Sequence, residues 1–373
     1  MNNNPFIIST YKSPAYFCNR KKETKQLKDA LENGRNIVLL SLRRMGKTGL
    51  IKHLFYKLES DKNVHTFYLD IMNTNSTEDF VNKLADSVLG TFNSRSKQLF
   101  DQVLQFFSKF NPLITFDAIT GVPSIELKPH SEQQAKNSLA KILDYLESQN
   151  KRIYIAIDEF QQITSYKDSD FEAFLRSHIQ HLKNVNFIFS GSQQHLLTSM
   201  FNSYSRPFYQ SSDFLKLERI DQSSYTDFII KKYKETNKII SKEIVIELLN
   251  WADTYTFYVQ NLFNKLWYVS GKQITKNDVE YTKSQIIGER NYIYLNLQNL
   301  LPKAQYYLLK AIAKNRGIDK PTSKYFVNKY NLGTPSTVST ALKILQTKEI
   351  IYKENNIYKI YDVFLAKWME EYE

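Results

Sequence analysis

The sequence predicts an α/β domain built on a parallel sheet, followed by an all-α segment and a C-terminal winged helix-turn-helix. Three observations lead to this fold class. The letters GKT stand between an apolar run and a helical pattern at residues 37–58, and a second apolar run at residues 154–157 ends in an acidic pair. After residue 292 the pattern changes to short helices and a hairpin. At 373 residues, two or three domains are expected.

The stretch IVLLSLRRMGKTGLIKHL at residues 37–54 nearly matches the phosphate-binding pattern G-x-x-x-x-G-K-[ST], with Ser41 in place of the first glycine. The apolar run at 37–40 is typical of a strand buried on both faces, and apolar residues recur at helical spacing after the loop. Because the first glycine serves only the turn out of the strand, serine fits there if its φ is negative. The alternative, a chance occurrence of the letters GKT, is disfavoured by this strand-loop-helix context.

Backbone N–H groups of such a loop and the following helix N-terminus face a bound phosphate. Gly46 would allow a close backbone approach, Lys47 would contact the β- and γ-phosphates, and the Thr48 hydroxyl would ligate Mg²⁺. The expected cofactors are therefore ATP and Mg²⁺. The candidate nucleotide-binding residues of the loop are Ser41, Arg43, Arg44, Met45, Gly46, Lys47, Thr48 and Gly49.

The segment KRIYIAIDEFQQI at 151–163 predicts the second half of the site. Asp158 and Glu159 end a buried strand, at the edge where open α/β sheets bind ligands. Asp158 would hold the magnesium through water, and Glu159 would orient or deprotonate the attacking water. The alternative is an acidic pair that favours the N-terminus of a helix running from Phe160.

With these motifs the chain resembles the AAA+ class of P-loop ATPases, within it the archaeal-type ATPase branch near the STAND signalling ATPases. FCNRKKETKQL at 17–27 is similar to the family's F-x-x-R-x-x-E-x-x-x-L, and the loop is similar to S/G-P-R-R-x-G-K-T-S-L, with Leu42 in place of the proline. The resemblance implies a parallel AAA+ core in which Phe17 and Arg20 border the nucleotide base. It also gives serine at the first loop position a precedent.

NFIFSGS at 186–192 resembles the strand that carries the sensor-1 residue of the family. The resemblance implies a contact to the γ-phosphate or the attacking water from Ser190, Ser192 or Gln193, of which the two serines are the better placed. The alternative is a Gly-Ser turn that closes a strand. It further implies that Arg206, after this segment, or Arg176, after DEF, is an arginine finger supplied by a neighbouring subunit of a homo-oligomer. A salt-bridged surface arginine is the alternative for each.

We expect an ATPase core at residues 1–217, a helical lid at 218–291 and a winged helix-turn-helix at 292–373. In the core, 113–127 reads as an inserted β-hairpin around a turn at Thr120 and Gly121. In the lid, apolar residues recur at helical spacing between 225 and 249. Thr256 stands where relatives often carry proline, so no nucleotide contact is predicted from the lid.

The C-terminal domain is predicted from helices at 304–312, 323–330 and 336–348 and strands at 349–353 and 357–360. On the third helix three residues would face the core, Val338, Leu342 and Leu345, and five would face out, Ser336, Thr337, Thr340, Lys343 and Thr347. Residues 301–373 hold 12 basic and 7 acidic residues. Hydroxyls and lysines suit phosphate contacts better than base contacts, so DNA binding and a protein-interaction module both stay open.

The composition of the chain limits the partners and the cellular compartment that we expect for the protein. The net charge is +12, with 39 Lys against 11 Arg, which indicates either an anionic partner such as DNA or the composition of an AT-rich genome. The single cysteine, Cys18, excludes an internal disulfide framework and is typical of a reducing compartment. Apolar runs are too short for a membrane span, so we expect a soluble, cytoplasmic protein without a membrane partner.

The function predicted from the sequence is a Mg²⁺-dependent ATPase of the AAA+ type, oligomeric, that couples nucleotide state to DNA or a partner protein through the winged helix. The catalytic candidates are Lys47, Glu159, Ser192, Arg206 and Arg176. A separate effector protein is an expected partner of such ATPases. The alternative is a STAND-like nucleotide switch with little turnover and no DNA binding.

Overall fold

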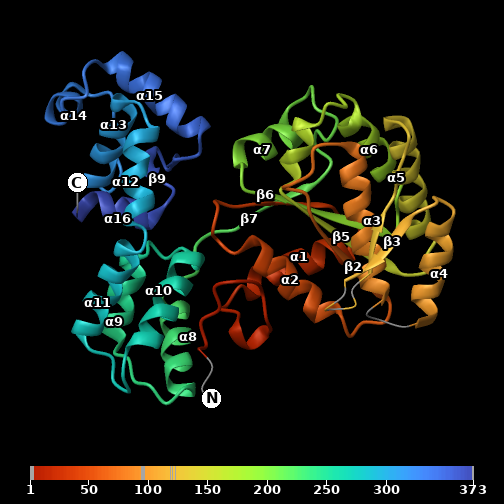
Figure 1. Cartoon of the computed structure of the whole chain (residues 1–373), viewed down its shortest axis with the longest axis horizontal. Helices are drawn as coiled ribbons and strands as arrows, with labels where there is room; N and C mark the ends of the chain where they lie inside the picture. The colour runs from red at the N-terminus through yellow and green to blue at the C-terminus, as the bar shows by residue number, and fades with distance from the viewer. Residues whose placement is uncertain (1–3, 94–96, 118, 120, 122, 372–373) are drawn as a thin grey trace. The chain divides into compact units, whose positions relative to one another are not determined.

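The computed structural model describes residues 4–93, 97–117, 119, 121 and 123–371. Chain contacts divide it into two units, one of residues 11–218 and one of residues 4–10 with 219–371. The first unit is built on a parallel sheet with the order β2-β5-β6-β1-β7 (Figure 1). Its strands are β1 (Ile37–Leu40), β2 (Val64–Asp70), β5 (Arg152–Asp158), β6 (Val185–Gly191) and β7 (Asp213–Lys216).

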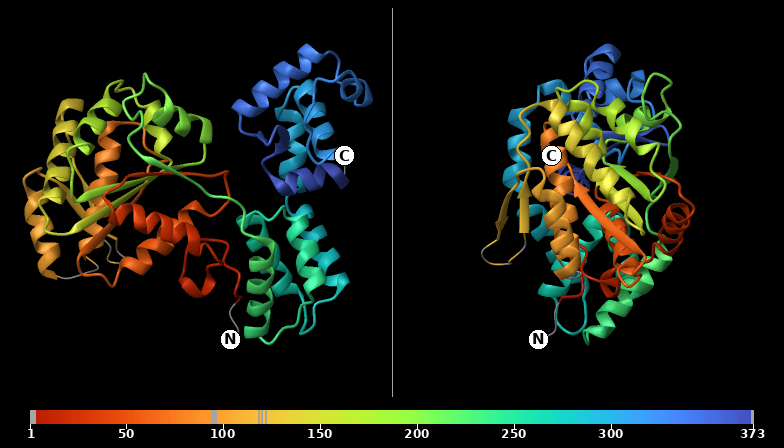
Figure 2. Two further views of the ribbon diagram at one scale, coloured as in Figure 1. Left: turned by 180° about the vertical axis from the view of Figure 1, so that it is seen from behind. Right: turned by 90° about the vertical axis from the view of Figure 1, so that its right-hand side faces the viewer.

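Helices cover both faces of this sheet (Figure 1, Figure 2). The helices of this unit are η1 (Pro14–Tyr16), α1 (Lys21–Glu32), α2 (Lys47–Leu58), α3 (Thr77–Asn93), α4 (Lys97–Ser108), α5 (Glu132–Glu147), η2 (Phe160–Ser165), α6 (Phe171–Ile179) and α7 (Gln194–Asn202). Between α4 and α5, β3 (Leu113–Phe116) pairs antiparallel with β4 (Pro123–Glu126). Thr120 of the predicted turn lies outside the described residues, and Gly121 has a φ of 67°.

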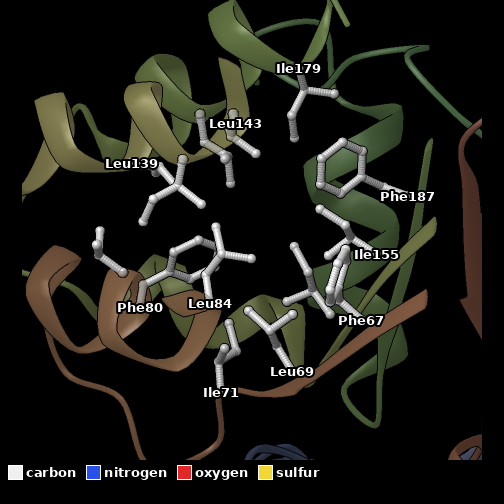
Figure 3. Packing of buried hydrophobic residues seen from close by; sticks show 14 of the residues in the cluster. Phe67, Leu69, Ile71, Phe80, Leu84, Leu139, Leu143, Ile155, Ile179 and Phe187 are labelled. Atoms are coloured by element: carbon white, nitrogen blue, oxygen red, sulfur yellow. The ribbon is translucent and has the colours of Figure 1, made fainter. Parts of the chain in front are cut away.

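Alternation along β5 directs its side chains to two different faces of the sheet, both of which are buried. On β5, Ile153, Ile155 and Ile157 belong to a buried cluster that includes Phe67 of β2, together with residues of α3 and α5 (Figure 3). Burial of one such side chain contributes about 1.5–3 kcal/mol. Because successive strand residues point to opposite faces, Asp158 projects to the other face, where Figure 1 places α1 and α2.

The second unit begins with a helical lid. Its helices are α8 (Gln222–Glu235), α9 (Lys242–Trp251), α10 (Thr256–Val269) and α11 (Lys276–Gly288). Residues near the N-terminus pack here. Phe6 is buried against the rings of Tyr233 and Phe263, and its carbonyl accepts a 2.5 Å hydrogen bond from Asn264. From the sequence, we predicted that this segment belongs to the core, because a lone apolar residue gives no signal of its distant partner.

The remaining elements form the winged helix. They are α12 (Asn291–Leu300), α13 (Lys303–Lys314), α14 (Lys324–Lys329), α15 (Pro335–Thr347), β8 (Ile351–Glu354), β9 (Ile357–Ile360) and α16 (Val363–Glu371). Ser323 and Thr334 cap α14 and α15 with their side chains, and the two hairpin residues Asn355 and Asn356 have positive φ, as a tight two-residue loop requires.

The predicted faces of α15 are confirmed. Val338, Leu342 and Leu345 are buried, and the five residues predicted to face outward are exposed. The first wing strand begins at Ile351, two residues later than predicted, because Glu349 has a left-handed φ of 53° just after the helix. No helix in the described ranges has the length and apolarity needed to cross a membrane.

Candidate functional site

The order of the sheet brings the two sequence motifs to one edge. Strand β6 lies between β1 and β5, so the loop after β1 and the acidic pair after β5 both follow carboxyl ends of parallel strands. Ser41 is fully buried and is not among the described residues with positive φ, as its replacement of glycine requires. Arg44 and Gly46 do have positive φ, 67° and 91°, and Gly46 caps the helix that begins at Lys47.

The carboxylate of Asp158 lies at the centre of a hydrogen-bond network. It accepts hydrogen bonds from the hydroxyls of Thr48 at 2.7 Å, Tyr68 at 2.8 Å and Ser190 at 2.6 Å. Burial disfavours the charged form, but these hydrogen bonds and the nearby charge of Lys47 outweigh burial and hold the pKa of Asp158 below its usual range. Burial, and then the charge of Asp158, raise the pKa of Tyr68, so this phenol stays a proton donor.

The residues around Asp158 fit a magnesium ion bound to a nucleotide. The Thr48 hydroxyl donates its hydrogen bond to Asp158, so the lone pairs of the hydroxyl oxygen stay available to a cation. Within the described ranges, no group of three or more His, Cys, Asp or Glu side chains is placed to hold a metal. Mg²⁺ needs no such group, because it is usually bound by one or two carboxylates, phosphate oxygens and water.

Glu159 directly follows, with a left-handed φ of 57° that few non-glycine residues adopt. Its Oε2 accepts hydrogen bonds from the Ser192 backbone N–H at 3.0 Å, the Ser192 hydroxyl at 2.9 Å and the Gln161 amide at 2.6 Å. The Ser192 hydroxyl in turn accepts a 3.2 Å hydrogen bond from Nε of Arg43 in the loop. Arg43 of the loop, Ser192 after β6 and Glu159 therefore form one connected network.

Phe17 and Arg20 lie beside the loop. Arg20 is 4% exposed, and its guanidinium donates to Glu23 at 2.8 Å and to the carbonyl oxygens of Glu218 at 2.6 Å and Met45 at 3.3 Å. The side chain of Arg20 thus contacts the backbone of the loop at Met45. Phe17 stacks on His53 of α2, with ring centroids 4.1 Å apart.

The two candidate finger arginines have different surroundings. Arg206 forms an ion pair with Glu172 on α6. Burial raises the pKa of Glu172 against the opposing charge of Arg206. Arg176 is half-buried, with no side-chain hydrogen bond or ion pair to the described residues. None of these contacts joins either arginine to the loop.

Two residues of the network, Tyr68 and Gln161, were not predicted from the sequence. Tyr68 lies on β2, and its signal is only the strand alternation that places it on the same face as Asp158 once the two strands are known to be neighbours. Gln161 follows the acidic pair by two residues, and glutamine at that spacing has no signal of its own.

A family model described as "ATPase domain predominantly from Archaea" matches residues 17–262. The chain belongs to this family. A second model, described as "Probable winged helix domain", matches residues 292–371. The resemblance to archaeal-type ATPases inferred from the motifs is therefore confirmed. No curated protein matches the sequence.

Solved structures resemble this archaeal-type ATPase over nearly the whole chain. A Walker-type ATPase of Pyrococcus abyssi has a TM-score of 0.69 at 18% identity, over 98% of this chain and 99% of that chain. The ORC2 protein of Aeropyrum pernix has a TM-score of 0.59 at 14% identity, over 99% and 96%. The ORC1 protein of the same organism, solved in complex with DNA, has a TM-score of 0.52 at 13% identity, over 96% and 95%. These likenesses confirm the predicted fold class.

Proposed function

We propose that the protein is a Mg²⁺-dependent ATPase whose nucleotide site is the network around Asp158. The observation that carries this proposal is the 2.7 Å hydrogen bond between Thr48 and Asp158, which brings the loop and the acidic pair together. In this proposal Lys47 neutralises the β- and γ-phosphates, and the metal, held by Thr48 and by Asp158 through water, supplies further charge neutralisation. Glu159 takes a proton from the attacking water, and Ser192 holds Glu159.

Steady-state ATP turnover tests this function. Glu159→Gln keeps the size of the side chain and removes the base, so we expect turnover to fall about a hundredfold or more. Glu132→Gln, an exposed residue at the start of α5, is the matched control and should retain the wild-type rate. Equal rates for the wild type and Glu159→Gln would exclude Glu159 as the base.

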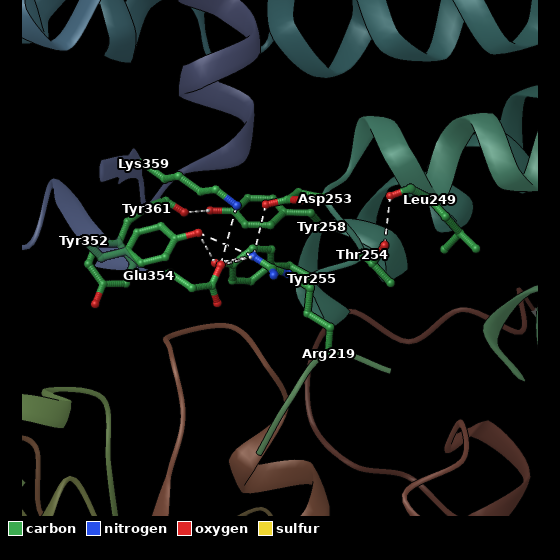
Figure 4. A network of polar contacts seen from close by, with 10 residues as sticks. All are labelled: Arg219, Leu249, Asp253, Thr254, Tyr255, Tyr258, Tyr352, Glu354, Lys359 and Tyr361. Atoms are coloured by element: carbon green, nitrogen blue, oxygen red, sulfur yellow. Dashed lines mark hydrogen bonds and ion pairs between the residues drawn. The ribbon is translucent and has the colours of Figure 1, made fainter. Parts of the chain in front are cut away.

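We propose further that nucleotide state is coupled to the lid and winged helix through three successive residues. The N–H of Leu217 donates to Leu40 at 2.8 Å, beside the loop, and the Glu218 carbonyl accepts from Arg20, which also contacts the loop. Arg219 continues into the lid, where its guanidinium bonds Asp253 and the wing residue Glu354, both at 3.2 Å (Figure 4). A shift of the loop is thereby connected, residue by residue, to this joint.

The partner of the winged helix is proposed to be DNA, contacted through phosphates in the 292–373 region. The exposed face of α15 carries hydroxyls and Lys343 without an acidic residue, which suits phosphate oxygens. A protein partner is the second candidate. It is favoured by exposed apolar side chains on the same domain, of which Tyr292 is 78% exposed, Leu300 74% and Tyr325 75%.

Assembly into a homo-oligomer is also proposed, with Arg206 as the finger. Arg206 is one-third exposed, so exchange of Glu172 for a phosphate of a neighbouring subunit needs only a side-chain movement. In this proposal the ion pair with Glu172 is the resting state of the arginine, and Arg176 is the second candidate.

A further inference from the structure

Gln161 lies in η2, two residues after the proposed base. The residue is only 5% exposed, yet of the two polar atoms of its side-chain amide just one has a hydrogen-bond partner in the described part of the chain. The Nε2 group donates a 2.6 Å hydrogen bond to Oε2 of Glu159. The Oε1 atom is buried without a hydrogen bond. A buried carbonyl oxygen without a hydrogen bond costs free energy. Another interaction of the same side chain must therefore offset this cost.

The orientation of this amide is fixed by chemistry. A carboxylate can only accept hydrogen bonds, so the NH₂ group of Gln161, and not its carbonyl oxygen, faces Glu159. A rotation of the amide by 180° would place two acceptors in contact. The hydrogen bond from Nε2 to Glu159 therefore leaves Oε1 of Gln161 buried without a partner.

Gly191 at the end of β6 makes room for this arrangement. A Cβ at Gly191 would lie 2.0 Å from Oε1 of Gln161 and 3.1 Å from its Cδ, far inside contact distance. Any side chain at position 191 would therefore displace the amide. The glycine is required for this close approach, since its own φ is not positive.

The two carboxylate oxygens of Glu159 differ in their hydrogen bonding. Oε2 accepts from Gln161 and twice from Ser192, whereas Oε1 accepts no hydrogen bond from the described residues. Ser192, the residue after β6, donates both of its hydrogen bonds from a single position in the chain. Gln161 adds a donor from η2, and two points of attachment on different elements restrict rotation of the carboxylate.

We propose that Gln161 is a positioning residue of the ATPase site, which fixes Oε2 of Glu159 so that Oε1 is the basic atom; this inference rests on the function proposed above. In the reaction, the water oxygen forms a bond to the γ-phosphorus while one water proton passes to Oε1. The bond from the γ-phosphorus to the β–γ bridging oxygen breaks, and its electron pair leaves with ADP. Gln161 touches neither the water nor the nucleotide.

Gln161→Met tests this role, because it keeps the length of the side chain and removes the donor. We expect kcat to fall about tenfold to a hundredfold with KM for ATP changed less than about twofold, since substrate binding does not involve this residue. Gln162→Met is the matched control. Gln162 donates instead to the Thr74 carbonyl at 2.9 Å and to Ser165, and its replacement should leave kcat unchanged.

A double-mutant cycle separates positioning from a general loss of structure. If Gln161 acts through Glu159, then Gln161→Met added to Glu159→Gln should lower kcat no further. Gly191→Ala should reproduce the Gln161→Met defect, and Gln161→Glu, which is nearly isosteric, offers a second variant if Gln161→Met does not fold. An equal loss in both backgrounds, or wild-type kcat in folded Gln161→Met and Gln161→Glu, would overturn the proposal.

These outcomes are distinguishable from a failure of the ATPase function. No turnover by the wild type would remove both proposals together. Turnover that depends on Glu159 but not on Gln161 would remove only the positioning role.

Discussion

The hydroxyl of Thr48 donates a 2.7 Å hydrogen bond to the carboxylate of Asp158, although 110 residues separate them in the sequence. Thr48 is the second residue of α2, and Asp158 is the last residue of β5. Their meeting depends on the parallel sheet, which carries both strand ends to one edge. The contact orients the threonine proton toward the carboxylate and away from the space in which a cation would bind.

Thr48→Ala should therefore weaken the response to metal. Loss of the hydroxyl removes one proposed ligand of Mg²⁺, so the Mg²⁺ concentration for half-maximal ATP turnover should rise about tenfold. Thr48→Ser keeps the oxygen and is the matched control. A titration of turnover with MgCl₂ measures the effect, and identical midpoints for Thr48→Ala and the wild type would contradict this role.

His53 predicts a dependence of stability on pH. Burial, and then the charge of Lys57, lower the pKa of His53 from 6.5 to about 4 in the fold, and its Nδ1 lies 3.0 Å from the Tyr11 hydroxyl. Between pH 6.5 and about 4 the unfolded chain takes up a proton that the folded chain does not, so the free energy of unfolding falls as pH falls. Urea unfolding should show a smaller loss over this range for His53→Asn. Parallel pH profiles for both proteins would contradict the assignment.

Arg219 predicts the stability of the joint between lid and wing. Its guanidinium stacks 4.7 Å from the Tyr255 ring centre, bonds Asp253 and Glu354, and is 27% exposed. Arg219→Met should lower the free energy of unfolding by about 1–3 kcal/mol, because partly buried acceptors lose their donor. Arg316→Met is the control, since Arg316 is 78% exposed and has one ion pair at 3.4 Å. Equal urea midpoints for the two variants would show that the network adds nothing.

Arg206 predicts complementation between subunits. Arg206→Ala and Lys47→Ala should each be inactive alone, and their mixture should recover part of the turnover, since a mixed interface joins an intact loop with an intact finger. A mixture of Arg176→Ala with Lys47→Ala tests the second candidate in the same way. Absence of recovery in both mixtures would restrict these arginines to structural roles, such as the Glu172 ion pair of Arg206.

DNA binding by the winged helix should be weak in sequence preference and strong in salt dependence. Lys343 is exposed on α15, so Lys343→Ala in the full chain should lower the slope of log affinity against log salt by about one. Lys231→Ala, 71% exposed on α8, is the control. Fluorescence anisotropy with a labelled duplex measures the slopes. No binding of the wild type at about 50 mM salt would favour the protein-partner interpretation.

The sequence predicted those parts of the site whose signals are local. Thr48 and Asp158 each lie in a short motif, and a general rule about strand ends sufficed to bring them together. Ser190 was predicted as a candidate because the segment 186–192 resembles the sensor-1 strand of the family. The outward face of α15 followed from helical spacing, because one helix buries one stripe of residues.

The rest depends on strand order and distant contacts. Tyr68 contacts Asp158 only because β2 is the neighbour of β5, and no local pattern specifies that neighbour. The Gln161 amide occupies space that a side chain at Gly191 would fill, yet neither residue has a local sequence signal of its own. Phe6 packs in the lid more than 200 residues away along the chain. Such pairs are set by tertiary packing, which propensity and spacing do not describe.

In the proposed function, the loop and the acidic pair together bind a magnesium-bound ATP. Isothermal titration calorimetry of the full chain with ATP, with Mg²⁺ and with excess EDTA, tests it most directly. We expect saturable heat with Mg²⁺ for the wild type, clearly weaker binding in EDTA, and no measurable binding for Lys47→Ala, whose side chain is 7% exposed at the start of α2. Absence of heat for the wild type with Mg²⁺, or equal affinities for the wild type and Lys47→Ala, would contradict it.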